Sequence, residues 1–222
     1  RPPLVGRVAA DAASGLEVPP GVREKTEFVG FLQRSKTRGD NPNRHEEDYI
    51  LVTTGGGGDG SELIDDVIRA YKFDRTLTQK ALVVLGPYMP TEQRQKFAAN
   101  VADIPQMEII DFDNRMEDLV AGAQGVVSMG GYNTVCEILS LKKRAIVVPR
   151  VTPTEEQWIR AERMWRLGFF KTIHPDALTP ERLLRALTEC LDGDGWLPPD
   201  INLNALPAVA ARVESLLEER LT

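Results

Sequence analysis

A glycine pair followed by small polar residues is the part of the sequence best suited to binding an anion. Gly130 and Gly131 follow a short apolar run and precede Tyr132, Asn133 and Thr134, where an amphipathic helix is predicted to begin. Glycine lets a ligand approach the backbone closely, and the unpaired N–H groups of a helix N-terminus attract negative charge. We therefore predict a phosphate cradle formed by these five residues.

An acidic residue lies one turn inside the same predicted helix. Glu137 stands three residues after Thr134, and this spacing fits a capping box between the two side chains. It also fits a carboxylate that accepts hydrogen bonds from the two hydroxyls of a ribose beside a bound phosphate. By themselves the residues favour the capping box over the ribose contact.

A run of glycines is the second candidate for anion binding. The segment TTGGGGDGSEL, residues 53–63, joins a predicted strand to a predicted helix. The N–H groups of Gly56, Gly57 and Gly58 can point at an anion beside the helix dipole. The alternative is a tight turn with Asp59 as the helix N-cap. Consecutive glycines carry an entropic cost that a plain turn does not require, which favours anion contact.

Three better-known kinds of site are disfavoured. A P-loop requires Lys before the Ser or Thr that follows its last glycine, and here Ser61 follows the glycine directly. A dinucleotide site requires an acid at the end of the next strand, where Gly86 and Pro87 stand instead. Asp111 and Asp113 have the spacing of a metal-binding pair but lie in a predicted polar loop. We therefore predict no metal and no cofactor.

The elements that must position these residues alternate between short apolar runs and amphipathic segments about three turns long. This alternation predicts a doubly wound α/β domain, a Rossmann-like parallel sheet with helices on both faces and ligands at the carboxyl ends of its strands. Strands are predicted at residues 49–54, 81–86, 107–112, 125–129, 144–149 and 169–173, with a further short strand at Glu27–Phe31. Helices are predicted at residues 61–71, 91–101, 115–123, 132–141, 155–168 and 180–191.

The chain is predicted to have three parts. Residues 1–46 form an arm, residues 47–191 form the sheet domain, and residues 192–222 form a linker and a terminal helix. Because the sequence starts without Met and without a clear first strand, we expect it to begin within a longer protein. The terminal helix has an apolar stripe that we expect to cover another surface. The stripe consists of Leu206, Val209, Val213, Leu216 and Leu217.

Composition disfavours several classes of protein. The 222 residues include 27 basic and 33 acidic side chains, and the net charge of -6 argues against a nucleic-acid surface or a polybasic membrane patch. Cys136 and Cys190 lie far apart without partners at ligand spacing, which indicates neither a zinc site nor a disulfide framework and fits the cytoplasm. No apolar run approaches the roughly 18 residues of a membrane span.

Three strings carry a resemblance to a known family. GGYNTVCE, RAIVVPR and EEQWIRAERMWRLG resemble the donor-nucleotide region of two-domain glycosyltransferases of the GT-B type. The nearest family is the bacterial N-acetylglucosaminyltransferase that completes the lipid-linked peptidoglycan precursor, and the resemblance extends from Lys25 to Leu191. It implies a GT-B carboxyl-terminal domain that binds a UDP-sugar. It also implies that Glu137 holds the ribose hydroxyls while the preceding helix N-terminus faces the diphosphate.

The resemblance also implies contacts to the sugar, with two departures. The family's paired glutamines, which contact the sugar hydroxyls, fall on Glu156 and Gln157, so only the second is kept. A family Asn falls on Arg160, whose charge could instead reach a phosphate. An N-acetylhexosamine is the expected sugar, although these departures leave its identity open.

Two weaker correspondences concern the diphosphate and the base. The family has a Gly-x-x-x-Arg whose Arg meets the diphosphate, and Gly30 and Arg34 have that spacing. In the segment that borders the base, backbone groups near Asp113 read the pyrimidine and Met116 lies at its edge. Met116 also suits an ordinary helix core. The family's glycine loop contains Ser and Gln that are missing here, so phosphate would be held by backbone alone, with Asp59 pointing away.

The implied reaction is an inverting, metal-independent transfer of the sugar to an unknown acceptor. Retaining relatives have a second Glu eight residues before the ribose Glu, and here that position is Met129. Arg34 and the helix N-termini would stabilise the leaving diphosphate. The general base would come from a missing N-terminal acceptor-binding domain, so this chain alone is expected to transfer nothing. Two alternatives stay open: an epimerase or hydrolase that uses Glu156 as acid or base, and a non-catalytic nucleotide-sugar-binding module.

Overall fold

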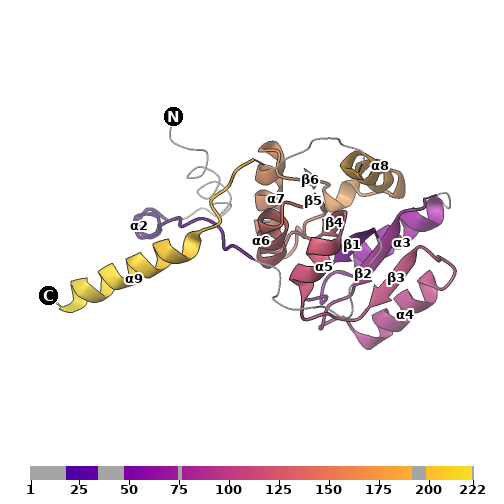
Figure 1. Ribbon diagram of the computed structural model, residues 1–222, viewed down its shortest axis with the longest axis horizontal. Coiled ribbons are helices and arrows are strands. Elements are labelled where there is room, and N and C mark those ends of the chain that lie inside the picture. The colour runs from indigo at the N-terminus through magenta and orange to yellow at the C-terminus, as the bar shows by residue number, and fades with distance from the viewer. Residues whose placement is uncertain (1–18, 35–47, 75–76, 192–198, 222) are drawn as a thin grey trace.

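The computed structural model describes residues 19–34, 48–74, 77–191 and 199–221. A parallel six-stranded sheet forms the centre, in the order β3-β2-β1-β4-β5-β6 (Figure 1). Its strands are β1 (Tyr49–Thr53), β2 (Lys80–Val84), β3 (Met107–Ile110), β4 (Gly125–Ser128), β5 (Arg144–Val147) and β6 (Lys171–Thr172).

Helices cover both faces of the sheet (Figure 1). One face carries α3 (Ser61–Phe73), α4 (Thr91–Val101) and α8 (Pro180–Leu191). The other face carries α5 (Met116–Gly122), α6 (Tyr132–Ser140) and α7 (Glu156–Arg166), and a short 3₁₀ helix, η1 (Pro175–Ala177), follows β6. The predicted doubly wound α/β fold is therefore confirmed.

Burial explains why these segments form strands and helices. All five residues of β1 are buried, as expected for the central strand of a parallel sheet covered on both faces. In α3, Ile64, Val67 and Tyr71 recur at spacings of three and four and are at most 2% exposed, so one stripe of the helix faces the core. Each face of the sheet has its own apolar cluster.

The chain changes direction across the sheet between β1 and β4. From β1 the chain winds outward through β2 to β3, and it then returns to place β4 on the other side of β1. Residues at the ends of the two strands are register partners, Thr53 opposite Ser128. Their carboxyl ends therefore lie side by side, with α3 and α6 leaving toward opposite faces. This is the topological switch point at which open α/β sheets bind ligands.

The strand predicted at Glu27–Phe31 is wrong. Gly30 has φ +99, and a Cβ there would lie 2.9 Å from the carbonyl oxygen of Asn202. The left-handed backbone interrupts an extended strand, and the segment instead makes one antiparallel bridge, Leu32 to Asn204, with the carboxyl-terminal tail. Phe31 is 4% exposed in the apolar cluster beneath α6, so the segment is anchored by a side chain.

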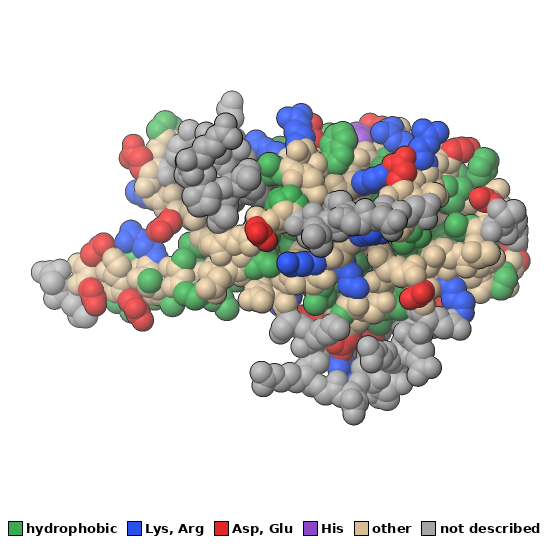
Figure 2. Space-filling model, turned by 45° about the horizontal axis from the view of Figure 1, so that its top comes forward, with side chains coloured by type: hydrophobic (Ala, Val, Ile, Leu, Met, Phe, Trp, Pro, Cys, Tyr) green, Lys and Arg blue, Asp and Glu red, His purple; other side chains and the backbone are tan. Residues whose placement is uncertain are grey.

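The carboxyl-terminal helix α9 (Ala205–Leu221) forms as predicted and extends away from the sheet domain, beside α2 (Pro20–Arg23) (Figure 1). Figure 2 shows hydrophobic side chains along its surface. Among the described residues, no helix combines the length and apolarity needed to cross a membrane. The residues of the apolar stripe of α9 are 41 to 66% exposed: Leu206, Val209, Val213, Leu216 and Leu217.

Candidate functional site

The loop between β4 and α6 opens directly onto the switch point. Gly130 has φ +70, and a Cβ there would lie 2.6 Å from Val147 Cγ1, so this position requires glycine. Gly131 is the N-cap of α6, and a Cβ there would meet no atom of the described residues within 4 Å. Within the described chain no side chain caps this helix, which leaves the N–H groups of Tyr132, Asn133 and Thr134 available to an anion.

The capping-box interpretation of Glu137 is wrong. Helix α6 begins at Tyr132, so Thr134 is its third residue and Glu137 its sixth, too deep for either side chain to cap it. Glu137 is 8% exposed, and its carboxylate accepts no hydrogen bond from the described residues. Burial, and secondly the charge of Glu117, raise its pKa to about 7, against a lowering by Arg34. A buried carboxylate without donors is costly unless a ligand supplies them.

Arg34 lies along α6 and reaches it from the arm. Its backbone N–H donates to Ser140 Oγ at 2.8 Å, and its Nη2 donates to Asn133 Oδ1 at 3.0 Å in the first turn. Its Nε is buried and has no acceptor within the described part of the chain. Beside it, Tyr132 stacks on Phe31 with ring centroids 6.0 Å apart. The structure therefore brings a guanidinium to the helix N-terminus.

The segment that precedes α5 lies near Glu137. Asp113 Oδ1 accepts a hydrogen bond from the backbone N–H of Arg115 at 2.7 Å, which fixes the turn before the helix. Met116 begins α5 and packs partly buried against the apolar cluster on this face. Helix α5 contacts α6, and the charge of Glu117, the residue after Met116, contributes to the raised pKa of Glu137.

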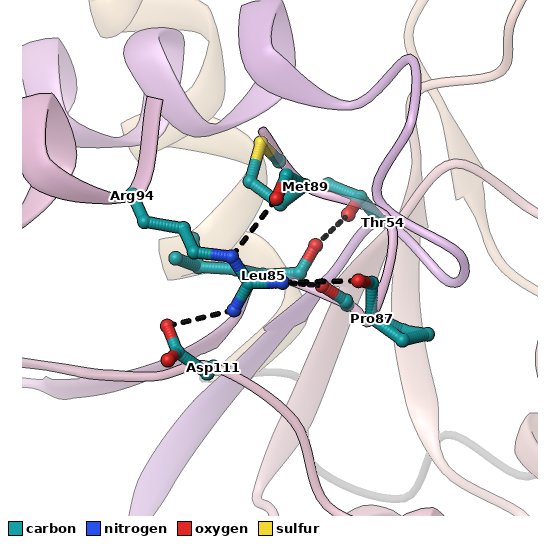
Figure 3. Close-up of polar contacts among 7 residues, drawn as sticks. Thr54, Leu85, Pro87, Met89, Arg94 and Asp111 are labelled. Atoms are coloured by element: carbon teal, nitrogen blue, oxygen red, sulfur yellow. Dashed lines mark hydrogen bonds and ion pairs between the residues drawn. The ribbon is translucent and has the colours of Figure 1, made fainter. Parts of the chain in front are cut away.

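The glycine loop between β1 and α3 is held by the neighbouring loop (Figure 3). Thr54 Oγ1 donates to the Leu85 carbonyl at 3.0 Å. The N–H of Tyr88 donates to the Gly56 carbonyl at 2.8 Å. A Cβ on Gly57, which has φ +87, would lie 2.2 Å from the Leu85 carbonyl oxygen. Gly57 is therefore required by packing, whereas Gly56 and Gly58 are exposed.

Asp59 does not cap α3. The N-cap of that helix is Gly60, which no side chain of the described residues caps, and the Asp59 carboxylate forms an ion pair with Arg150 Nη1. Arg150 lies in the loop between β5 and α7 and also donates its backbone N–H to Gln157 Oε1 at 3.2 Å. Sequence reasoning assigned Arg150 no role. The feature of the sequence that could have indicated a role for Arg150 is its position just beyond the carboxyl end of a predicted strand.

The side chains predicted to contact the sugar, those of Glu156, Gln157 and Arg160, form contacts with other residues of the protein. Arg160 is 6% exposed; its Nη1 pairs with Glu156 one turn earlier, and its Nη2 donates to the Gly130 carbonyl at 3.2 Å. Its Nε is buried without an acceptor among the described residues. Arg160 therefore braces the β4–α6 loop, and Gln157 braces the loop before α7.

A cavity of about 560 Å³ lies on the α3 side of the switch point. Its lining includes Met129 after β4, Arg150 after β5 and Asp176 in η1. None of the residues predicted to contact a ligand lines it.

Within the described ranges, no group of three or more His, Cys, Asp or Glu could hold a metal. Asp111, one of the two aspartates that have the spacing of a metal-binding pair, forms an ion pair with Arg94 at 2.9 Å.

Sheet order and loop position define a Rossmann-like domain whose ligand-binding edge lies at the switch point. Residues 49–195 match the family described as the glycosyltransferase family 28 C-terminal domain, and this covers more than half of the chain. The chain belongs to this family.

Curated relatives carry glycosyltransferase names. The chain is 27% identical over 154 residues to an uncharacterised glycosyltransferase of Methanopyrus kandleri, a match that covers 69% of this chain and 40% of that protein. It is 29% identical over 143 residues to the UDP-N-acetylglucosamine–N-acetylmuramyl-(pentapeptide) pyrophosphoryl-undecaprenol N-acetylglucosamine transferase of Haemophilus influenzae, covering 64% and 39%. The chain thus spans less than half the length of these relatives.

Solved structures with a similar fold include a glycotransferase and MurG. The glycotransferase of kitacinnamycin has a TM-score of 0.63 at 17% identity, covering 99% of this chain and 54% of that chain. MurG of Acinetobacter baumannii has a TM-score of 0.55 at 20% identity, covering 64% and 41%. At these identities the similarity concerns the fold, and it agrees with the prediction of a GT-B carboxyl-terminal domain.

Proposed function

We propose that this chain is the donor-binding half of a glycosyltransferase that takes a sugar from a UDP-sugar. Family membership supports sugar transfer from a nucleotide sugar, and the relative from Haemophilus influenzae is named for a UDP-sugar donor. The observation that carries the proposal is Glu137, a buried carboxylate with no donor among the described residues, beneath an uncapped helix N-terminus. The hydroxyls of a ribose supply the donors that this carboxylate lacks.

Helix α6 then binds the two parts of the nucleotide in order along its axis. The N–H groups of its first turn face the diphosphate. Glu137 follows five residues after Tyr132, about 7.5 Å further along the helix axis, where the ribose would lie. Arg34, held at the first turn by Asn133, adds positive charge for the leaving diphosphate. This arrangement stabilises the leaving group without a metal, and we propose an inverting, metal-independent transfer.

The remaining predicted contacts surround this axis. The base would lie against the segment from Asp113 to Met116, close to Glu137. The backbone N–H groups of Gly56 and Gly58, two exposed residues, would contact the diphosphate from across the switch point. Glu156, Gln157 and Arg160 would border the sugar, which we propose is an N-acetylhexosamine. Arg160 already donates a hydrogen bond to the Gly130 carbonyl. It would therefore act on the phosphate indirectly, by holding the β4–α6 loop in place and by its positive charge nearby.

The acceptor and the general base are proposed to belong to an upstream domain. Residues 1–46 would form the connection to it, residues 47–191 the donor-binding domain, and residues 192–222 the linker and crossing helix. The exposed apolar stripe of α9 would pack on that upstream domain. This chain by itself would bind the donor and transfer nothing.

An epimerase or hydrolase of the same fold is the alternative. It would need an acid or base beside the sugar, and the only candidate from the sequence, Glu156, is ion-paired with Arg160. Release of free UDP from UDP-N-acetylglucosamine without an acceptor would support that alternative. Binding without turnover, even in the full-length protein with acceptors present, would support a non-catalytic module.

Calorimetry with UDP tests the proposal. We expect the chain to bind UDP at millimolar concentration or below, and Glu137→Gln to weaken binding by at least about tenfold, because an amide replaces only part of a carboxylate's acceptor capacity. Glu92→Gln, at an exposed position on the opposite face, is the matched control and should bind as the parent does. Absence of binding at millimolar UDP, or equal binding by Glu137→Gln, would contradict the proposed site.

A further inference from the structure

Arg94 occupies an unusual position on the opposite side of the switch point from α6. It is the fourth residue of α4, where a basic side chain opposes the helix dipole. Its guanidinium turns back over the helix start (Figure 3). It donates from Nε to the Met89 carbonyl at 2.8 Å and from Nη2 to the carbonyls of Gly86 and Pro87 at 2.9 and 3.1 Å. Its Nη1 pairs with Asp111 Oδ1 at 2.9 Å.

The ion pair and the hydrogen bonds of Arg94 differ in how strongly they hold the loop. The Asp111 side chain is 70% exposed, so the ion pair contributes little by itself. The three carbonyl groups converge on one guanidinium whose side chain is 21% exposed, and a charged donor makes the stronger kind of hydrogen bond. Arg94 therefore mainly fixes the course of the β2–α4 loop, residues 85–90.

That loop in turn supports the glycine loop. The Tyr88 N–H holds the Gly56 carbonyl, and the Leu85 carbonyl accepts from Thr54 and abuts Gly57. A Cβ on Gly86 would lie 2.4 Å from the Gly55 carbonyl oxygen, so the two loops are in close backbone contact. On its other side, the Gly86 N–H donates to the Asp111 carbonyl at 2.9 Å. Arg94 thus contacts the loops that follow β2 and β3 directly, and it reaches the loop that follows β1 only through residues 85–90.

We propose that Arg94 is a positioning residue for the diphosphate: it holds the β2–α4 loop in the shape that orients the backbone N–H groups of the exposed residues Gly56 and Gly58 toward the ligand. The inference rests on the proposed function. Arg94 touches no ligand; it acts through loop 85–90. A backbone amide binds an oxyanion well only when it is held in place before the ligand arrives.

The test compares two substitutions of Arg94 with a control on the same helix. Arg94→Gln removes the charge and the fork of donors. Arg94→Lys keeps a partner for Asp111 but replaces the fork by a single ammonium, which cannot reproduce all three carbonyl contacts. Lys96→Gln removes the ion pair that Lys96 makes with Asp65 of α3 at 2.7 Å, away from the three loops. All are titrated with UDP and with uridine well below their melting temperatures.

We expect Arg94→Gln to weaken UDP binding by about tenfold and uridine binding by less than about twofold, since the lost charge-assisted contacts orient only the phosphate-facing loop. Arg94→Lys should restore part of the UDP affinity, and Lys96→Gln should bind both ligands as the parent does. The amide resonances of Gly56 and Gly58 should shift in the Arg94 variants and stay in place in Lys96→Gln. A purely stabilising Arg94 would lower the melting temperature and leave these resonances and both affinities unchanged.

Two outcomes separate the inference from the proposed function. If the parent chain binds no UDP, the proposed function is wrong. If the parent binds UDP but the Arg94 variants bind it equally well, or lose UDP and uridine affinity in the same proportion, the positioning role is wrong while the proposed function stands.

Discussion

The two glycine loops at the switch point use the same residue for different purposes. In the loop after β1, Gly57 lies against the Leu85 carbonyl and is buried, so the neighbouring loop dictates the glycine. In the loop after β4, Gly130 is required by its backbone and by Val147, but Gly131 has open space where a side chain would lie. The first loop, which we call the platform loop, is held in place by its neighbour. The second, which we call the open loop, leads into the uncapped N-terminus of α6.

This difference shows that glycine content alone does not locate an anion site. Both loops have the composition of a phosphate cradle, and both lead to helices that no described side chain caps, yet among the described residues only the helix after β4 holds a buried carboxylate without a hydrogen-bond donor, Glu137. The glycines of the first loop are partly explained by close packing. Three tests, each built on one main substitution, address this comparison.

The largest effect is expected from Gly57→Ala in the platform loop. A methyl group would meet the Leu85 carbonyl at 2.2 Å and φ is +87, so we expect a loss of about 3 kcal/mol in the free energy of unfolding. Gly58→Ala, where nothing lies within 4 Å, should change it by less than about 0.5 kcal/mol. Urea denaturation measures both. Equal stabilities for the two variants would show that packing does not dictate Gly57.

The second test concerns Glu137 and the pH dependence of stability. Its pKa is raised from 4.5 to about 7 in the folded chain, so the folded state holds its proton more tightly than the unfolded state. The stability linked to this group is present below pH 4.5 and is lost as the pH rises through about 7. Glu137→Gln removes the ionisation and should be more stable than the parent by about 2 to 3 kcal/mol at pH 8, with little gain at pH 5.

Urea unfolding at pH 5, 6, 7 and 8 measures this gain. Glu117→Gln is a companion variant: without the neighbouring charge the pKa of Glu137 should fall, and the pH at which stability declines should fall with it. A constant stability difference between Glu137→Gln and the parent across this range would show that the carboxylate is not buried and unpartnered in solution.

The smallest effect is expected from Gly131→Ala in the open loop. Its φ is -56 and a Cβ meets nothing within 4 Å, so the free energy of unfolding should change by less than about 1 kcal/mol. The methyl group would stand where a phosphate approaches the backbone, so UDP affinity should fall by about tenfold. Calorimetry with UDP and a thermal melt separate the two effects. Unchanged affinity would place the phosphate elsewhere.

Local pattern sufficed for most of the fold. Short apolar runs such as residues 81–84 alternate with amphipathic segments such as α3, and this alternation predicts a doubly wound sheet because each pattern matches one backbone period. The segment Glu27–Phe31 was misassigned because its apolar residues also suit a single anchor, Phe31, and because the conformation of Gly30 depends on contact with Asn202.

The sequence by itself determined the order of elements, the two loops and the candidate contacts at the switch point, since turn chemistry and hydrophobic period are local properties. Only the tertiary structure decided which glycine is held by packing, that Asp59 pairs with Arg150, and that Arg160 braces Gly130. It also removed the capping role of Glu137 and showed that Arg94 holds the β2–α4 loop, which in turn contacts the glycine loop. These outcomes depend on residues distant in the chain whose side chains meet only after the sheet has formed.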